Sequence, residues 1–209
     1  MITVSTIKIP YDKLLIRLGY WQTKTKLNKK TDESIKEILD LAQKLIKPKI
    51  VTAFENTIVN EQEILFNNGY KIKSASVASL LRNSFRAYGV GITIGNTLED
   101  KRAESLRKGE IFSALILDAA GSVAAEETMI LVNAQIKIYE EKNGNKLTKR
   151  YSPGYGDWVL EDNRQFLSWL GAERIGIKLN EFCQMIPEKS ISALIGVEKL
   201  ENKKERICG

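Results

Sequence analysis

Arg150-Tyr-Ser-Pro-Gly-Tyr155-Gly-Asp-Trp158 is the stretch of this 209-residue sequence from which its fold can be inferred. An arginine guanidinium offers a planar, two-pronged donor that matches a carboxylate or a phosphate. Gly154 and Gly156 permit backbone angles that a side chain would hinder, so we expect at least one of them to have a positive φ or to leave no room for a Cβ. Tyr155 between them can stack on a base or face a cation. Taken alone, the stretch is also typical of an ordered surface loop with a packing tyrosine.

The segments on either side of this loop read as helices and strands without regular βαβ order. Apolar residues spaced three to four apart predict helices over residues 31–46, 75–88, 110–139 and 161–170, with a short helix after Thr97. Apolar runs predict strands over 50–54, 89–94, 147–151, 178–186 and 190–197, with 57–66 extended or mixed and a turn at 67–69. Pro187-Glu-Lys189 is expected to join the last two strands as a hairpin. This segregation of helices and hairpins predicts an α+β fold in one domain.

Two stretches rich in small residues favour close packing. The glycines of Gly89-Val-Gly-Ile-Thr-Ile94 lie inside a predicted strand, whereas a dinucleotide-binding loop needs them at a strand-to-helix turn. Ala119-Ala-Gly-Ser-Val-Ala-Ala125 lies in the middle of the long predicted helix, where small side chains let another backbone or a ligand approach. Tight helix packing is the plain interpretation, and Glu126 and Glu127 would then form a solvated edge.

The composition excludes several classes of function. The sequence has no histidine, which excludes Ser-His-Asp and Cys-His nucleophiles, HExxH zinc sites and His-ligated haem. Its two cysteines cannot build a disulfide scaffold, so a reduced, cytoplasmic compartment is expected. Cys183 is expected to be a core thiol on a buried strand. We find no signal peptide at the N-terminus and no run of the ~18 apolar residues that a membrane span requires.

The net charge of +6 predicts either a solvated basic surface or an acidic protein partner. No nucleic-acid motif accompanies the charge, and aromatic residues do not alternate with it, so nucleic-acid binding is not expected. The basic residues stand in small groups: Lys24, Lys26, Lys29 and Lys30; Lys47 and Lys49; Lys199, Lys203, Lys204 and Arg206. Asp157 and Glu161 are carboxylates of a kind expected at a turn and a helix start.

The loop 150–158 resembles the RxxxGY loop of the activation domain of vitamin B12-dependent methionine synthase. Downstream, Gly176–Pro187 followed by Ser190-Ile-Ser192 resembles that family's G-x-x-L-T-x-S-x-x-M-x-P…S-V-S stretch. Upstream, Val90–Gly95 and Leu117–Glu126 are similar to its strand and long helix. The resemblance covers about residues 74–197, and more loosely 12–20.

This resemblance implies one activation-type domain over residues 1–209: an N-terminal part to about 70, a core over about 74–197 and a polar tail over 198–209. The family fold is a bent antiparallel sheet with helices packed around it. The family domain binds S-adenosylmethionine and presents its methyl group to cob(II)alamin held on another module, while a flavodoxin-like protein supplies the electron. By position, Arg150 would grip the ligand, Tyr155 would line the pocket with Gly154 and Gly156 shaping the loop, and Glu126 matches a helix glutamate.

The resemblance implies neither a catalytic residue nor a metal ligand in this chain, so any cobalamin must come on a partner, either a methionine synthase or another corrinoid protein. The chain would then be an activation component rather than a self-sufficient enzyme. It departs from the family at Gly144 and Asn145, where full-length members have an acidic residue, and after Ser192, where they carry paired tyrosines. These departures leave an alternative open: a docking protein for a corrinoid protein that has lost the S-adenosylmethionine site.

Overall fold

The strand β4 (Arg86–Thr93) lies near the centre of a six-stranded antiparallel sheet. The computed structural model describes residues 7–20 and 26–200. The strand order is β3-β2-β1-β4-β8-β5, and every neighbouring pair is antiparallel. The other strands of this sheet are β1 (Lys49–Val59), β2 (Glu63–Phe66), β3 (Lys71–Lys73), β5 (Asn145–Leu147) and β8 (Ser190–Lys199). A separate two-stranded ribbon pairs β6 (Lys178–Leu179) with β7 (Met185–Ile186).

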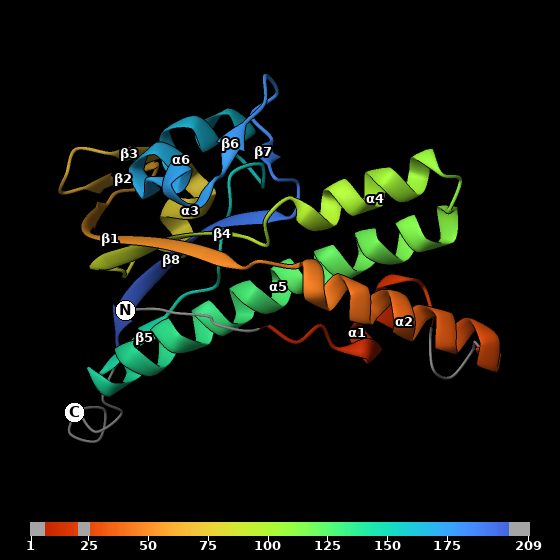
Figure 1. Ribbon diagram of the computed structural model, residues 1–209. Coiled ribbons are helices and arrows are strands. Elements are labelled where there is room, and N and C mark those ends of the chain that lie inside the picture. The colour runs from red at the N-terminus through yellow and green to blue at the C-terminus, as the bar shows by residue number, and fades with distance from the viewer. Residues whose placement is uncertain (1–6, 21–25, 201–209) are drawn as a thin grey trace.

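Helices cover both faces of the sheet, as Figure 1 shows. One set packs with the sheet into a first hydrophobic cluster: α1 (Tyr11–Arg17), α2 (Lys29–Leu45), α4 (Thr97–Arg107) and α5 (Ile111–Lys142). The other set forms a second cluster on the opposite face: α3 (Ala75–Leu80), α6 (Asn163–Leu170) and the 3-10 turn η2 (Ala172–Ile175). A further 3-10 turn, η1 (Leu160–Asp162), leads directly into α6. The molecule is therefore an α+β domain built around one bent antiparallel sheet, which confirms the predicted fold class.

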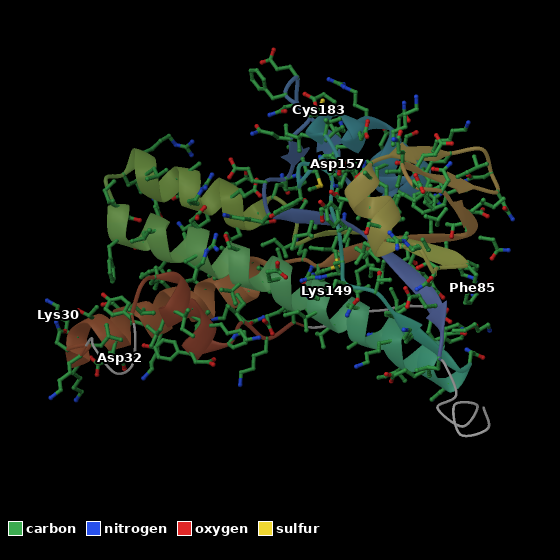
Figure 2. The ribbon with its side chains drawn as sticks, turned by 180° about the vertical axis from the view of Figure 1, so that it is seen from behind. Lys30, Asp32, Phe85, Lys149, Asp157 and Cys183 are labelled. Atoms are coloured by element: carbon green, nitrogen blue, oxygen red, sulfur yellow. The ribbon has the colours of Figure 1, made fainter. Side chains whose placement is uncertain are left out.

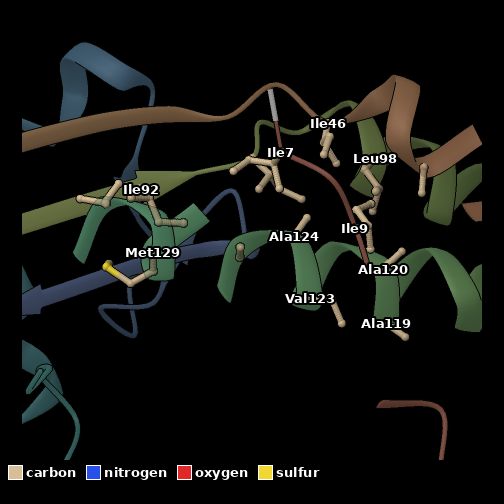
Figure 3. Close-up of a cluster of buried hydrophobic side chains, with 14 of the residues drawn as sticks. Ile7, Ile9, Ile46, Ile92, Leu98, Ala119, Ala120, Val123, Ala124 and Met129 are labelled. Carbon is tan, nitrogen blue, oxygen red and sulfur yellow. The ribbon is translucent and has the colours of Figure 1, made fainter. Parts of the chain in front are cut away.

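The 32-residue helix α5 joins the sheet to the helical end of the molecule. It contacts β4, β5 and β8 along the sheet and α1, α2 and α4 beyond it. Figure 3 shows Ala120 and Ala124 of this helix close to Ile9 and Ile7 of the N-terminal segment. A Cβ on Gly121 would lie only 3.1 Å from the Leu98 side chain. The small residues of α5 thus allow close packing of neighbouring elements, as the sequence predicts.

The glycines of β4 serve the same purpose on the other face of the sheet. Val90 and Ile92 point into the first cluster, so Gly89 and Gly91 face the second. A Cβ on Gly89 would lie 2.3 Å from the Trp169 ring, a distance that no real contact allows. Close packing against α6 therefore explains these glycines, and no nucleotide loop is formed.

A buried carboxylate fastens the C-terminal end of α5 to the sheet. Glu140 accepts a hydrogen bond from the Tyr88 hydroxyl at 2.6 Å and one from Asn145 Nδ2 at 2.6 Å, and Arg86 lies 3.6 Å away. Burial first, and then the contact with Glu140, raises the pKa of Tyr88. Because Asn145 begins β5, this cluster sets where the chain leaves the helix and starts toward the loop at 150–158.

The helix predicted over residues 75–88 is wrong in its second half. α3 ends at Leu80, and β4 begins at Arg86, earlier than the predicted strand at 89. Phe85 and Tyr88 continue the helical spacing, but β4 pairs with β1 on one side and with β8 on the other. Two long ladders of backbone hydrogen bonds outweigh the local helical preference of these residues.

The hairpin predicted at Pro187-Glu-Lys189 is also wrong, as is the continuous strand predicted over 178–186. β6 and β7 pair with each other around a turn over residues 180–184. The Asn180 carboxamide closes this turn by accepting hydrogen bonds from the backbone N–H groups of Phe182 and Gln184 at 3.0 and 2.9 Å. Cys183 is buried as predicted, but it lies in the turn with a φ of 61° rather than on a strand.

Several predicted boundaries shift. α2 begins at Lys29 because the Asn28 side chain accepts a hydrogen bond from the backbone of Thr31 at 2.8 Å. The predicted strand over 147–151 is replaced by β5 and an isolated bridge between Tyr151 and Leu194. The polar tail predicted from 198 begins inside β8 and reaches residues 201–209, which lie outside the described part. The described part also leaves out several members of the predicted basic groups: Lys24, Lys203, Lys204 and Arg206.

Candidate functional site

A cavity of about 630 Å³, the loop pocket, lies between the loop at 150–155, the middle of α5 and the start of β8. Three residues predicted to bind a ligand line it: Glu126, Arg150 and Tyr155. The other lining residues are Tyr151, Ser152, Pro153, Leu160, Asn163, Gln184, Met185, Ser190, Ile191 and Ser192. The predicted residues Gly154 and Gly156 shape the loop but do not line the cavity.

Opposite charges meet at one side of the loop pocket. Arg150 follows β5 by three residues, and Glu126 lies near the middle of α5, yet Arg150 Nη2 is 3.2 Å from Glu126 Oε2. Their side chains are 32% and 54% exposed, so both groups remain accessible from solvent. The pocket thus offers one cation and one anion within reach of the same small molecule, and each neutralises the other.

The glycine-bracketed loop has the backbone that the sequence predicts. Gly154 has a φ of 92° and Gly156 a φ of 56°, both in the region that side chains disfavour. A Cβ on Gly156 would also lie 2.2 Å from the Tyr151 hydroxyl. The Trp158 backbone closes the loop, accepting from Gly154 N at 2.7 Å and donating to the Tyr155 carbonyl at 3.1 Å, and its ring is fully buried. Tyr155 is left at the rim of the pocket, 69% exposed.

Asp157 anchors the end of this loop to the start of α3. Its carboxylate accepts hydrogen bonds from the Ser74 hydroxyl and from the backbone N–H groups of Ala75, at 2.7 Å, and Ser76, at 3.2 Å. Hydrogen bonds from Ser74 and Ser76 lower the pKa of Asp157 to about 2. Figure 2 labels Asp157 near this junction. The sequence explains Asp157 as an ordinary turn residue and does not reveal this long-range anchor.

A buried polar chain forms the floor of the loop pocket. Asn163 is 2% exposed; its Nδ2 donates to the Cys183 carbonyl at 3.1 Å, and its Oδ1 accepts from the Ser192 hydroxyl at 3.3 Å. Ser152 Oγ donates to the Ser192 carbonyl at 2.6 Å. These bonds tie the loop, α6 and β8 together. Asn163 is absent from the predicted site, although a polar residue on the apolar face of a predicted helix is a usable signal.

The segment between β7 and β8 is clamped by charges from α4 and α5. Lys189 Nζ lies 2.8 Å from Asp118 and 3.0 Å from the Ser122 hydroxyl, and Arg102 bridges Asp118 at 2.6 Å and Glu188 at 3.0 Å. Partial burial favours the neutral carboxyl, but the bonds from Lys189 and Arg102 outweigh it and lower the pKa of Asp118. Because Met185 and Ser190 flank this segment and line the pocket, the clamp fixes one of its walls.

The described residues contain no group of three or more Asp, Glu, Cys or His side chains placed to hold a metal ion. No helix among them has the length and apolar character that crossing a membrane requires.

Sequence comparisons give little on the family of this chain. No family model matches it. It is similar to proteasome β subunits of Methanococcus vannielii and of two strains of Methanococcus maripaludis, with 35% identity over 75 residues in each case. These matches cover 35% of this chain and 33% of each relative, so the chain spans about a third of the length of the curated relatives that it matches. A match of this extent does not assign the chain to their family.

Comparison of structures is more informative. The solved MetH reactivation domain bound to AdoHcy superposes on this chain with a TM-score of 0.62. The match covers 83% of this chain and 66% of that one, at 11% sequence identity. At this identity the likeness is one of fold alone. The chain therefore shares its α+β fold with the reactivation domain of MetH.

Proposed function

We propose that this protein binds S-adenosylmethionine in the loop pocket and presents its methyl group to a corrinoid held by a partner protein. The observation that carries the proposal is the convergence of Glu126, Arg150 and Tyr155 on one cavity. The fold shared with a domain solved in complex with AdoHcy, the demethylated form of this ligand, supports the same ligand class.

The chemistry of the loop pocket suits this ligand. S-adenosylmethionine carries an ammonium, a carboxylate and a sulfonium beside its adenosine. Glu126 can pair with the ammonium, Arg150 with the carboxylate, and the Tyr155 ring can cover the sulfonium or the adenine. A ligand with both charges replaces the existing pair at 3.2 Å by two new pairs and leaves no charge unpaired. The volume of about 630 Å³ is that of a small-molecule site.

The partner follows from what this chain lacks. The sequence has no histidine and hence no imidazole to ligate cobalt, so we place the corrinoid on a second protein, a cobalamin-binding methionine synthase or a related corrinoid protein. The corrinoid would supply the reduced cobalt that accepts the methyl group, with the electron coming from a flavodoxin-like donor. This chain's own contribution is to hold the methyl donor in place, which needs no acid, base or nucleophile from the protein.

Two measurements test the proposal. Calorimetry should detect S-adenosylmethionine binding in the micromolar range or weaker, where 1 μM corresponds to about −8 kcal/mol. Mixing the protein with a cob(II)alamin-loaded methionine synthase core, a reductant and S-adenosylmethionine should form methylcobalamin, followed by absorbance, only when both the protein and S-adenosylmethionine are present. Absence of heat and of a thermal shift at millimolar ligand would refute the proposal.

A docking protein for a corrinoid protein, without S-adenosylmethionine binding, is the second candidate. It is favoured by the ion pair between Arg150 and Glu126, because each charge already has a partner without a ligand. A stable complex with the cob(II)alamin-loaded protein, formed without S-adenosylmethionine and without methylation, would select this candidate.

A further inference from the structure

A second cavity, the basic groove, adjoins the loop pocket at Arg150. It has a volume of about 690 Å³ and lies between the C-terminal part of α5 and the chain from β5 to Arg150. Its lining includes Asn133, Lys137, Glu141, Lys146, Lys149 and Arg150. Arg150 lines both this groove and the loop pocket, so the two cavities share one guanidinium.

Cations outnumber carboxylates in the basic groove. Lys137, Lys146, Lys149 and Arg150 line it together with a single acid, Glu141. Two acids that do not line it pair with these cations: Glu198 lies 3.0 Å from Lys146, and Glu126 lies 3.2 Å from Arg150. Glu141 lies 3.7 Å from Lys137, one helical turn away, and such exposed pairs contribute little. Among the residues that the structure describes, no carboxylate comes within ion-pair distance of Lys149, which lies beside α5 (Figure 2). Four cations therefore stand against three carboxylates, and Lys149 carries the positive charge that no described carboxylate pairs with.

Asn133 supplies a polar group in the same groove. Its Oδ1 is buried and has no hydrogen-bond partner within the described part of the chain. Ionised phosphate oxygens accept hydrogen bonds, so this oxygen cannot bind them, and the amide can serve an anion only through its Nδ2 donors. A site of this composition fits a ligand with several negative charges better than one with a single carboxylate.

We infer that the basic groove binds a small polyanion bearing phosphate groups, and that this anion draws on Arg150 in competition with the loop pocket. Lysine ammonium groups bind phosphate as point charges, and arginine adds a two-pronged contact. The phosphate groups can come from free pyrophosphate or from the tail of an adenine nucleotide whose adenosine enters the loop pocket.

The competition for Arg150 has a direct consequence. One guanidinium cannot bind a phosphate in the groove and a carboxylate in the pocket at full strength, so occupancy of the groove should weaken binding of S-adenosylmethionine. This coupling rests on the proposed function. Binding of the anion to the groove does not depend on the proposed function.

Calorimetric titration of the full chain with pyrophosphate, at constant ionic strength set with sodium chloride, tests the inference. Saturable binding is expected in the wild type, and about three- to tenfold weaker binding in Lys149→Ala, the loss of one partly exposed charged contact. Lys149→Arg should keep most of the affinity. Lys142→Ala is the matched control, because Lys142 is an exposed lysine on α5 that does not line the groove.

Each result of these titrations supports or contradicts a different part of the inference. Tighter binding of ADP than of pyrophosphate, with competition between the two, would identify the nucleotide as the source of the phosphate groups, and equal or weaker binding would identify free pyrophosphate. Absence of saturable binding, or an equal loss in Lys142→Ala and Lys149→Ala, would overturn the inference. Unchanged affinity for S-adenosylmethionine in saturating pyrophosphate would overturn the sharing of Arg150. Pyrophosphate binding without any S-adenosylmethionine binding would refute the proposed function and leave the groove intact.

Discussion

Arg150 is the side chain on which ligand affinity in the loop pocket should depend most. Its guanidinium lines the pocket 3.2 Å from Glu126, and in the proposed function it receives the ligand carboxylate. Arg150→Ala should weaken S-adenosylmethionine binding by ~1.5–3 kcal/mol, about 10- to 150-fold in Kd by calorimetry, because a charge-assisted hydrogen bond is lost. Arg107→Ala, at an exposed arginine on α4, should leave the affinity unchanged. Equal affinities in the wild type and Arg150→Ala would contradict the assignment.

Asp157 should make the stability of the loop depend on pH. Its pKa falls from an ordinary value of 3.8 to about 2 on folding, so its contribution is fully present above pH ~4 and is lost as the pH falls toward 2. In Asp157→Asn this contribution is missing at every pH. The difference in Tm between wild type and Asp157→Asn should therefore be largest at neutral pH and narrow below pH ~4, measured by circular dichroism. A difference that stays constant from pH 7 to pH 2 would show that the carboxylate charge is not involved.

At the scale of elements, the contact between β4 and α6 is the one most sensitive to added volume. A Cβ on Gly89 would meet the Trp169 ring at 2.3 Å and Leu170 at 2.6 Å, whereas one on Gly91 would meet Val51 at 3.0 Å. Gly89→Ala should lower the free energy of unfolding by ~1–3 kcal/mol through overpacking, and Gly91→Ala by less, in urea denaturation. Trp169→Leu added to Gly89→Ala should recover part of the loss. An unchanged urea midpoint in Gly89→Ala would mean that α6 moves aside freely.

The sequence predicts the elements whose signals are local and misses those that depend on distant partners. The long helix is predicted over 110–139 and found over Ile111–Lys142, because its periodicity runs over many turns. Phe85 and Tyr88 also fit a helical pattern. Only the pairing of β4 with β1 and β8 places Tyr88 in a strand, with Phe85 directly before it. That pairing joins residues about 40 and 100 positions apart, which a local pattern does not contain.

The residues of the site fall into the same two groups, those that the local sequence predicts and those that depend on distant partners. Gly154, Tyr155 and Gly156 have positions that the loop sequence alone explains, since the backbone angles follow from residue type. Glu126 belongs to the predicted site only because the family resemblance matches it, by position, to a helix glutamate. Lys189 is missed because its partners in the clamp lie 67 residues or more away, and nothing near it in the sequence indicates them.

At the scale of the whole molecule, the net charge of +6 should affect the rate at which the protein associates with the proposed corrinoid partner. If the partner surface is acidic, association is faster at low salt and slows as screening increases, because the Debye length falls from about 10 Å at 0.1 M to 3 Å at 1 M. Stopped-flow association with a cob(II)alamin-loaded methionine synthase core should slow steadily between 50 and 500 mM sodium chloride, with a smaller change in dissociation rate. An association rate independent of salt would exclude electrostatic steering.

The closed loop over the pocket also has an optical consequence. Trp158 is fully buried directly behind Tyr155, bonded to it through the backbone at 3.1 Å and packed edge-on against Phe166 at 5.2 Å between ring centroids. Indole emission shifts in wavelength and intensity with the polarity and packing around the ring, so any ligand that displaces this loop changes the light emitted by Trp158. The sequence has three tryptophans, and Trp158→Phe separates this signal from the other two. A ligand that displaces this loop can therefore be followed by the emission of Trp158, without attaching a dye.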